Sequence, residues 1–306
     1  METYEKPPSR KPGRPRKERN ILNTTLPVEE KSCLDAQLVS SGECPQDNEA
    51  LKSKYDEMHT KGRLSWFSDG AEERAGIIRV GEPWHDLGVL EIGCGEGLLA
   101  SILKERINSI TAIDYSEVAI NKAKEKYPNI DFRCEKHQDH TSRYSRIIMQ
   151  GVIEHLDKPF EELEWMIDNL LRPNGDIITS SPGFLNPRGI VWMTLDMLGA
   201  VMSTTDLHYL NPFEFQKFCY ENDYKLSMSS CDVSWAKGED MVNDLKQRIP
   251  LAFKDGMIPH DDKKLNKFME WLSYLSSEIP LGPLGGATVI YRIQTERSLN
   301  GYKVTK

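Results

Sequence analysis

The sequence predicts an α/β fold in which helices cover both faces of a doubly wound, mostly parallel sheet of seven strands. Two observations lead to this prediction. Short apolar runs alternate with longer helical segments between about residues 89 and 180, which is typical of parallel strands joined by crossover helices. Three closely spaced glycines follow the first apolar run and precede a helix, so we expect a ligand crevice at the carboxyl ends of the strands.

Seven segments have the length and composition of strands. The five short apolar runs are Val89–Ile92, Ile110–Ile113, Ile130–Phe132, Ile147–Met149 and Ile177–Thr179. Two later candidates are Lys225–Ser229 and Ala287–Ile293. The segments that favour helices are Leu98–Arg106, Ser116–Tyr127, Pro159–Leu171, Pro212 to about Asn222, and Asp262–Leu275. Asn211 is the expected cap of the helix that Pro212 begins, with Glu214 as its third residue.

The composition is that of a globular chain. Its 306 residues can bury a sizeable core without disulfides or metals, and 39% of them are hydrophobic. No apolar stretch reaches the roughly eighteen residues that a membrane-spanning helix needs. The six cysteines include no C-x-x-C pair, and the charged, proline-rich amino terminus lacks the apolar region of a secretory signal. We therefore expect a reduced, cytoplasmic setting.

The amino terminus is basic although the whole chain has a net charge of −8. The first 20 residues hold seven lysines and arginines against three acidic residues. Residues 1–50 show little hydrophobic periodicity, so we expect a flexible arm followed by one domain over 51–306. SRKPGRPRK, residues 9–17, resembles an AT-hook, which would make a weak contact with A·T-rich DNA through the minor groove. A solvated basic tail explains the same residues.

The glycine turn lies in VLEIGCGEGLLA, residues 89–100. Gly93, Gly95 and Gly97 permit positive φ and let a ligand approach bare backbone, with the amides of the next helix facing it. The third glycine comes one residue too early for the G-x-G-x-x-G pattern of dinucleotide sites, which counts against NAD. Asp114 ends the second strand and can accept hydrogen bonds from both ribose hydroxyls. The sequence therefore predicts a bound nucleoside.

Several motifs in this order resemble those of the class I S-adenosylmethionine-dependent methyltransferases. They are E-x-G-C-G-E-G at 91–97, Asp-Tyr-Ser at 114–116, GVIEHL at 151–156 and LRPNGD at 171–176. The set is most similar to the ubiquinone-biosynthesis O-methyltransferases. The resemblance implies a Rossmann-like methyltransferase fold, S-adenosylmethionine as cofactor, and transfer of its methyl group to an acceptor, with a hydroxyl of a small molecule as the expected acceptor.

The resemblance also implies a set of site residues. Glu91, Gly93 and Gly95 would surround the methionine part of the cofactor, with Cys94 and Gly97 in the same turn, Asp114 on the ribose, Tyr115 beside the adenine, Asp139 at the adenine amino group and Gln150 near the sulfonium. His155 and His208 are candidate bases for a hydroxyl acceptor, and Glu154 would orient either one. The E-x-x-E-H pattern of the ubiquinone branch is associated with a metal, but Gly151 replaces its first acid. We therefore expect no metal.

Residues 183–210 form an expected insertion beside the acceptor site. Its apolar stretch, Gly189–Met202, is too short to span a bilayer and fits either a buried helix or a lid over the acceptor. Two other functions remain open. A nucleic-acid methyltransferase would use the basic arm, although GVIEHL is not the Asn/Asp-Pro-Pro-Tyr/Phe motif of base N-methylation. A DNA-tethered module could instead sense a ligand without catalysis. The sequence does not distinguish O- from N- or C-methylation.

Overall fold

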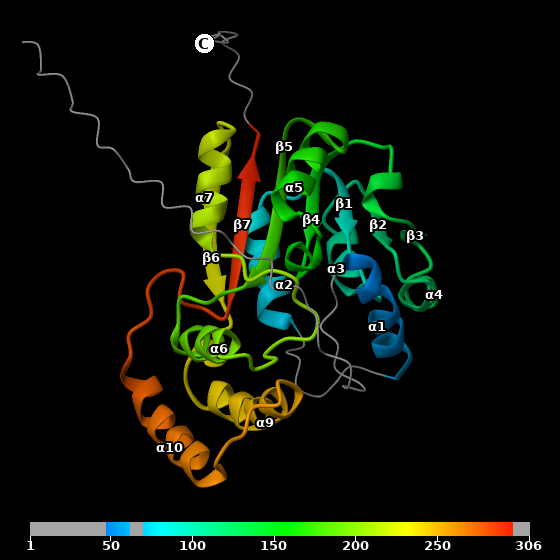
Figure 1. Ribbon diagram of the computed structural model, residues 1–306. Helices are drawn as coiled ribbons and strands as arrows, with labels where there is room; N and C mark the ends of the chain where they lie inside the picture. The colour runs from blue at the N-terminus through cyan, green and yellow to red at the C-terminus, as the bar shows by residue number, and fades with distance from the viewer. Residues whose placement is uncertain (1–46, 62–69, 296–306) are drawn as a thin grey trace, which may run out of the picture. The chain divides into compact units, whose positions relative to one another are not determined.

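The computed structural model describes residues 47–61 and 70–295, so the AT-hook-like segment at 9–17 lies outside the described residues (Figure 1). The strands are β1 (Gly88–Ile92), β2 (Ser109–Asp114), β3 (Asp131–Cys134), β4 (Tyr144–Met149), β5 (Leu171–Pro182), β6 (Lys225–Cys231) and β7 (Thr288–Gln294). The helices are α1 (Asn48–Lys61), α2 (Ala71–Gly81), α3 (Leu98–Lys104), α4 (Glu117–Lys126), α5 (Pro159–Asn169), α6 (Pro187–Met197), α7 (Pro212–Glu221), α8 (Val233–Ala236), α9 (Glu239–Asp255) and α10 (Asp262–Glu278). Two short 3₁₀ turns, η1 (His137–Asp139) and η2 (Ile153–His155), complete the elements.

The seven strands form one sheet in the order β3-β2-β1-β4-β5-β7-β6. All neighbouring pairs are parallel except those that β7 makes with β5 and with β6. The predicted fold class is therefore confirmed. The strand order reverses between β1 and β4, and in an open α/β sheet such a reversal leaves a crevice at the carboxyl ends of the two strands.

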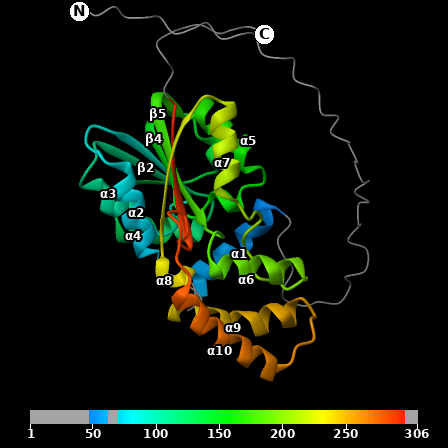
Figure 2. The same ribbon diagram turned by 90° about the vertical axis from the view of Figure 1, so that its left-hand side faces the viewer.

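Helices cover both faces of the sheet (Figure 2). Leu163 and Met166 of α5 and Phe215 of α7 pack on one face, against the central strands. On the other face, apolar side chains of α2, α3 and α4 form a second core cluster with β1, β2 and β3. Burial on both faces explains why nearly every residue of β1 and β4 is buried, with no alternation between buried and exposed positions.

Two insertions build a third apolar cluster beyond the carboxyl edge of the sheet. Trp192 of α6 packs there with Met241 and Leu245 of α9 and with Met269 and Leu272 of α10. The sequence predicted α10 but missed α9, whose apolar residues are interrupted by charges and by a proline at position 250. Both helices belong to the segment between β6 and β7.

One interpretation of the sequence expected helix α6 to be buried all round. The structure shows that it is buried on one side only. It buries Trp192, whereas Ile190 and Met197 expose 66% and 78% of their surface. The apolar stretch therefore has one face against α9 and α10 and another that no described residue covers. None of the helices in the described residues has the length and apolar character needed to cross a membrane.

The predicted helix start at Asn211 is confirmed, and the helix predicted from Ser116 has that residue as its cap. Asn211 and Glu214 form a reciprocal capping box at the start of α7, with Pro212 as the first helical residue. Ser116 caps α4 by accepting a hydrogen bond from the backbone N–H of Ala119. Strand β5 is longer than the predicted Ile177–Thr179, because it starts at Leu171 and pairs with β7 through Pro182.

A buried ion network joins α2 to three strands. Asp176 on β5 accepts hydrogen bonds from Arg146 on β4 at 2.6 and 2.8 Å and from Arg292 on β7 at 2.7 Å. Arg292 also donates to the backbone carbonyl of Val80 in α2 at 2.9 Å, and Arg146 donates to that of Gly81. One buried and one partly buried guanidinium group thus pair with the same carboxylate.

We predict that Asp176→Asn lowers the free energy of unfolding by about 3–5 kcal/mol, because it leaves the buried Arg146 and the partly buried Arg292 without their counter-ion. Asp131→Asn is the matched control, since Asp131 pairs with Arg133 at the surface and such pairs contribute about 1 kcal/mol or less. Urea unfolding followed by circular dichroism measures both. Equal losses in the two variants would show that the Asp176 network does not hold these elements together.

Candidate active site

One cavity of about 420 Å³ opens at the carboxyl ends of the strands, a size suited to a small-molecule ligand. Residues of the glycine turn, of the ends of β2 and β4, and of α1, α2, α6 and α9 line it. The cavity therefore connects the predicted nucleoside crevice with the two insertions.

The three glycines of the turn have different reasons to lack a side chain. All three have positive φ, at +70° for Gly93, +51° for Gly95 and +81° for Gly97. A Cβ on Gly93 would lie 2.4 Å from Val152, and one on Gly97 would lie 2.4 Å from the ring of Phe132. A Cβ on Gly95 would have only His59 nearby, at 3.8 Å. Gly95 alone has free space over it, and it lines the cavity.

This corrects the role expected for Gly97. It does not line the cavity, and its missing side chain makes room for Phe132 of β3 and for Ala123 of α4. Gly97 therefore allows close packing of the turn against the second core cluster.

Asp114 holds the glycine turn in place. Its Oδ2 accepts from the backbone N–H of Gly95 at 2.9 Å, and its Oδ1 accepts from that of Ser116 at 2.8 Å. An ionised carboxylate has about four acceptor sites, so about two remain for a ligand. Burial raises the pKa of Asp114, and these two amide hydrogen bonds oppose that effect.

Neither Glu91 nor Cys94 lines the cavity wall. Glu91 is 3% exposed, and its Oε2 has no hydrogen-bond partner among the described residues. Burial, followed by the charge of Asp114, raises the pKa of Glu91 to about 8. Cys94 is buried, and burial raises the pKa of its thiol well above the usual value.

Of the remaining predicted cofactor residues, two line the cavity and one does not. Tyr115 and Gln150 line the cavity, and the Gln150 side chain donates to Glu73 at 2.8 Å. The expectation placed Gln150 near the sulfonium, and here its side chain is also engaged with a neighbouring carboxylate. Asp139 is exposed in η1 and is not part of the cavity wall, so the structure does not bring it together with the other cofactor residues.

Sequence reasoning missed the residues that α1 contributes. Tyr55 and His59 lie one turn apart on α1, and both line the cavity. The helix is fixed to the rest of the domain at its first residue, where the Asn48 side chain donates to the carbonyl of His155 at 2.8 Å. No local pattern around Tyr55 indicates a role in a site 100 residues away.

His155 is held in one orientation by two hydrogen bonds. Its Nδ1 lies 2.8 Å from the carbonyl oxygen of Thr205, which can only accept, so Nδ1 carries the proton. Nε2 therefore has the lone pair, and it accepts from the hydroxyl of Tyr55 at 2.9 Å. Burial lowers the pKa of His155, while the charge of Asp206 opposes this. The result is a neutral imidazole whose basic nitrogen faces Tyr55.

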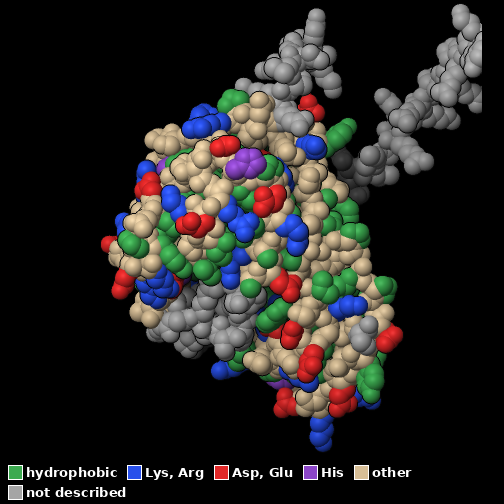
Figure 3. Space-filling model, turned by 180° about the vertical axis from the view of Figure 1, so that it is seen from behind, with side chains coloured by type: hydrophobic (Ala, Val, Ile, Leu, Met, Phe, Trp, Pro, Cys, Tyr) green, Lys and Arg blue, Asp and Glu red, His purple; other side chains and the backbone are tan. Residues whose placement is uncertain are grey.

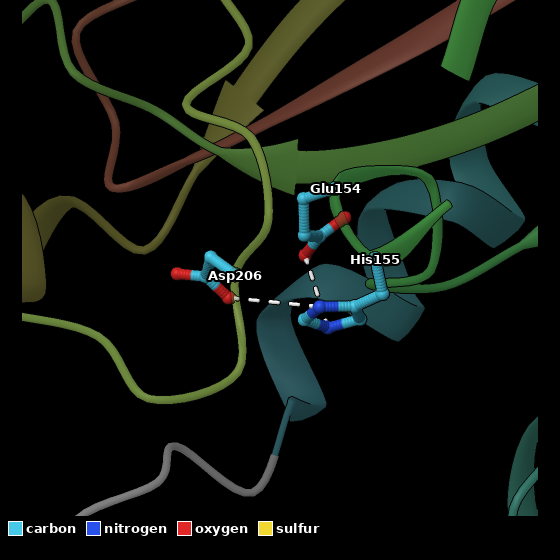
Figure 4. A group of neighbouring side chains, drawn as sticks. All are labelled: Glu154, His155 and Asp206. Atoms are coloured by element: carbon cyan, nitrogen blue, oxygen red, sulfur yellow. Dashed lines mark ion pairs between the residues drawn. The ribbon is translucent and has the colours of Figure 1, made fainter. Parts of the chain in front are cut away.

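Glu154 and Asp206 complete a cluster with His155 (Figure 4). Glu154 Oε1 lies 3.9 Å from His155 Nε2, and Asp206 Oδ1 lies 3.8 Å from Nδ1. Burial and the charge of Asp206 raise the pKa of Glu154 well above its usual value, which favours its neutral form. Glu154 therefore adds no charge that would orient a neutral imidazole.

Asp206 supplies a third potential metal ligand that the sequence did not indicate. Ligand atoms of Glu154, His155 and Asp206 all lie within 4.8 Å of one another, close enough to hold one ion. Both ring nitrogens of His155 are already hydrogen-bonded, which favours a proton-transfer cluster over a metal centre. The expectation of no metal remains a prediction.

His208 is not brought to the cavity. Its Nε2 lies 3.1 Å from the carbonyl oxygen of Asp157, and its backbone N–H donates to the carbonyl of Glu154 at 3.1 Å. It does not line the cavity wall. The residue therefore anchors the loop that carries Asp206, and of the two candidate bases only His155 lies in the site.

The sequence of the chain matches a known family. A family described as a methyltransferase domain matches residues 64–226, more than half of the chain. The chain belongs to this methyltransferase family. The expectation of a class I S-adenosylmethionine-dependent methyltransferase is thereby confirmed as a family assignment.

Curated relatives of this methyltransferase domain include ubiquinone biosynthesis O-methyltransferases. That of Acinetobacter baylyi is 26% identical over 151 residues, which cover 44% of this chain and 59% of the relative. That of Coxiella burnetii is 32% identical over 103 residues, covering 30% and 42%. The chain thus spans about three-fifths or less of these relatives.

Solved structures show the same fold. The methyltransferase domain is similar to a DhpI–SAH complex, with a TM-score of 0.51, 14% identity, and coverage of 82% of this chain and 98% of that chain. It is equally similar to the [4+2]-cyclase SpnF, with a TM-score of 0.51, 11% identity, and coverage of 84% and 99%. Because a structure titled as a cyclase shares the fold, the function must be argued from the site.

The packing role of Gly97 predicts a difference between two glycine variants of the methyltransferase domain. We expect Gly97→Ala to lower the free energy of unfolding by about 1–3 kcal/mol more than Gly199→Ala does, because overpacking costs this much. Gly199 is the matched control, since its φ is +92° and a Cβ there would have nothing within 4 Å. Thermal and urea unfolding measure both. Equal destabilisation would mean that backbone strain, and not Phe132, explains Gly97.

Proposed function

We propose that this protein transfers the methyl group of S-adenosylmethionine to a hydroxyl group of a small molecule. The observation that carries the proposal is that one cavity contains both a nucleoside-binding carboxylate, Asp114, and a neutral histidine, His155, whose basic nitrogen faces a tyrosine hydroxyl. The first group suits the donor, and the second suits an acceptor that must lose a proton.

The residues around Asp114 fit S-adenosylmethionine. Asp114 keeps about two acceptor sites for the two ribose hydroxyls. Gly95 leaves space over its backbone, and Tyr115 offers an aromatic side chain on the same wall. Gln150 and Glu73 line the cavity and would face the methionine part. When bound, the cofactor supplies a methyl group on a good leaving group, so the protein's main tasks are alignment and proton removal.

Proton removal would pass through Tyr55 to His155. The acceptor hydroxyl donates to the Tyr55 oxygen while the Tyr55 proton moves to Nε2 of His155 over 2.9 Å. The imidazolium that results keeps its Nδ1 hydrogen bond to Thr205 and gains an ion pair with Asp206, whose Oδ1 is 3.8 Å away. The lowered pKa of His155 keeps the imidazole ready to accept a proton at neutral pH.

Of the alternative functions, methylation of nucleic acid receives no support from the described surface in Figure 3. Lysines and arginines are interspersed with aspartates and glutamates on that face, whereas a nucleic-acid site needs a basic patch. The insertion at 183–210 supplies lining residues of the cavity, including Arg188 and Trp192, which supports an enclosed site for a small acceptor.

The assignment of the cofactor can be tested by binding alone. We expect Asp114→Asn to weaken S-adenosylhomocysteine binding by about 1–3 kcal/mol, because hydrogen bonds to a carboxylate are worth this much. Asp139→Asn is the matched control and should bind normally, because Asp139 is exposed and lies off the cavity wall. Isothermal titration calorimetry decides both. Tighter binding of NAD than of S-adenosylhomocysteine would overturn the assignment.

The assignment of the base can be tested with a panel of phenols and catechols, scored by S-adenosylhomocysteine production. With the best acceptor, we expect His155→Gln and Tyr55→Phe each to lower turnover by about 10²-fold or more, while cofactor affinity changes little. His208→Gln is the matched control and should retain activity. Because burial lowers the pKa of His155, turnover should fall with acidity only below the ordinary histidine range of about 6.5.

Two outcomes would contradict this mechanism. Full activity of Tyr55→Phe with loss of activity in His155→Gln would mean that the acceptor contacts the imidazole directly. Loss of activity in the presence of EDTA, restored by Mg²⁺, would make Glu154, His155 and Asp206 a metal centre instead. Nitrogen-15 NMR of His155 offers a readout that needs no acceptor, since the structure requires the Nδ1–H form at neutral pH.

A further inference from the structure

Two arginines from the insertions line the cavity described above. Arg188 near the start of α6 and Arg248 on α9 both bind the carboxylate of Asp244, with the shortest distances at 3.2 Å. The side chains are buried, with exposures of 12%, 17% and 1% respectively. These residues come from segments that are far apart in the sequence, and no motif indicated them.

The chain fixes the position of Arg188 firmly. Asn186 caps α6 by accepting from the backbone N–H of Gly189 at 2.8 Å. The amide of the same side chain donates to the carbonyls of Gly183 and Gly286 at 2.8 and 2.9 Å, so the start of α6 is tied to the loops at the end of the sheet. Arg188 follows two residues after the cap. Its guanidinium therefore has a set place on the cavity wall.

Arg188 has hydrogen-bonding capacity that the protein does not use. A guanidinium carries five N–H donors, and the described residues offer Arg188 a carboxylate contact only through Nη2. Its Nε is buried and has no hydrogen-bond partner among the described residues. A buried donor without a partner is costly, which favours a ligand that can accept from it.

The charges of the cluster point to an anion. The guanidinium groups of Arg188 and Arg248 both pair with the carboxylate of Asp244. Asp206 is close enough to act on Arg188 electrostatically, but its Oδ1 lies toward His155 at 3.8 Å. Burial lowers the pKa of Arg188, the effect expected where a buried cation is incompletely compensated. A bound oxyanion would supply the missing compensation.

The wall around the arginines is aromatic. The guanidinium carbon of Arg188 lies 4.4 Å from the centre of the Trp192 ring, and that of Arg248 lies 4.9 Å from it. Phe184 and Trp235 line the same cavity. Such stacking holds both guanidinium planes in fixed orientations, which suits the recognition of planar or branched oxyanions.

We infer that the methyl acceptor carries an oxyanion, a carboxylate or a phosphate, which binds Arg188 and Arg248 while its apolar body packs against the aromatic wall. The inference rests on the proposed function and specifies the substrate class of the same site. The alternative is that Arg188, Asp244 and Arg248 form an ion network that only joins α6 to α9. If the network only joins the helices, the affinity for a ligand does not depend on the ligand's charge. If the arginines bind the ligand, the affinity does depend on that charge.

The experiment compares three probes of similar shape with the full chain in the presence of S-adenosylhomocysteine. Benzoate carries a carboxylate, phenyl phosphate carries a phosphate, and benzamide is the neutral counterpart of benzoate. Ligand-observed NMR titration suits the weak binding of such fragments. We expect benzoate or phenyl phosphate to bind at least about tenfold more tightly than benzamide, because charge-assisted hydrogen bonds are worth a factor of this size. The tighter of the two identifies the oxyanion.

The variants separate binding from structure. Arg188→Met should abolish the preference for the anion, and Arg188→Lys should keep part of it, because lysine retains the charge but not the planar donor set. Lys246→Met is the matched control, since Lys246 is exposed on α9 and lies off the cavity wall. It should leave the preference unchanged. Melting temperatures confirm that each variant is folded.

Equal affinity of the wild-type protein for the three probes would overturn the inference, whatever the variants do. A preference for the anions that survives in Arg188→Met would also overturn it, since the preference would then come from elsewhere. Calorimetry with S-adenosylhomocysteine on the same preparation tests the proposed function separately. Normal cofactor binding without anion preference defeats the inference alone, whereas anion preference without cofactor binding defeats the proposed function.

Discussion

The geometry of the cavity depends on the two hydrogen bonds that the Asp114 carboxylate accepts. They join the turn after β1 to the start of α4, two loops that leave neighbouring parallel strands at the same edge of the sheet. The backbone at Gly93 and Gly95 has positive φ and belongs to no helix or strand, so it needs such anchors. One carboxylate thereby shapes the turn and presents its remaining acceptor sites to a ligand. Binding and local folding use the same side chain.

Much of the fold could be predicted because its signals are local. Val89–Ile92 is apolar except for Glu91 since β1 is buried on both faces, and Asn211-Pro212 marks a helix start through groups only a few residues apart. The same reasoning misplaced Gly97, because a missing side chain does not say whether a ligand or Phe132 takes the space. Asn186-Pro187 repeats the Asn211-Pro212 signal, so the same interpretation predicts a helix that starts at Pro187.

The contacts that His155 and Arg188 make could not be predicted, because they join distant segments. Tyr55 meets His155 across 100 residues, and Arg188 meets Asp244 across 56. Neither pair leaves a periodic or motif-like trace in the sequence. The contact between the two insertions is visible only in three dimensions. There α6, α9 and α10 pack into a separate apolar cluster outside the sheet. The carboxyl edge of the sheet thus carries one half of the cavity, and a second, independent core carries the other half.

Helix α1 spans both halves. His59 lies at the glycine turn, where its ring approaches Glu96 at 3.5 Å, while Tyr55 one turn earlier binds His155. Lys54 fastens the same helix to the carbonyl of Thr204 at 2.7 Å, beside the Asp206 loop. A rigid helix cannot shift at His59 without shifting at Tyr55. Under the proposed function α1 lies between the two ligands, so a shift that one ligand imposes on α1 would change the affinity for the other, and by reciprocity by the same factor.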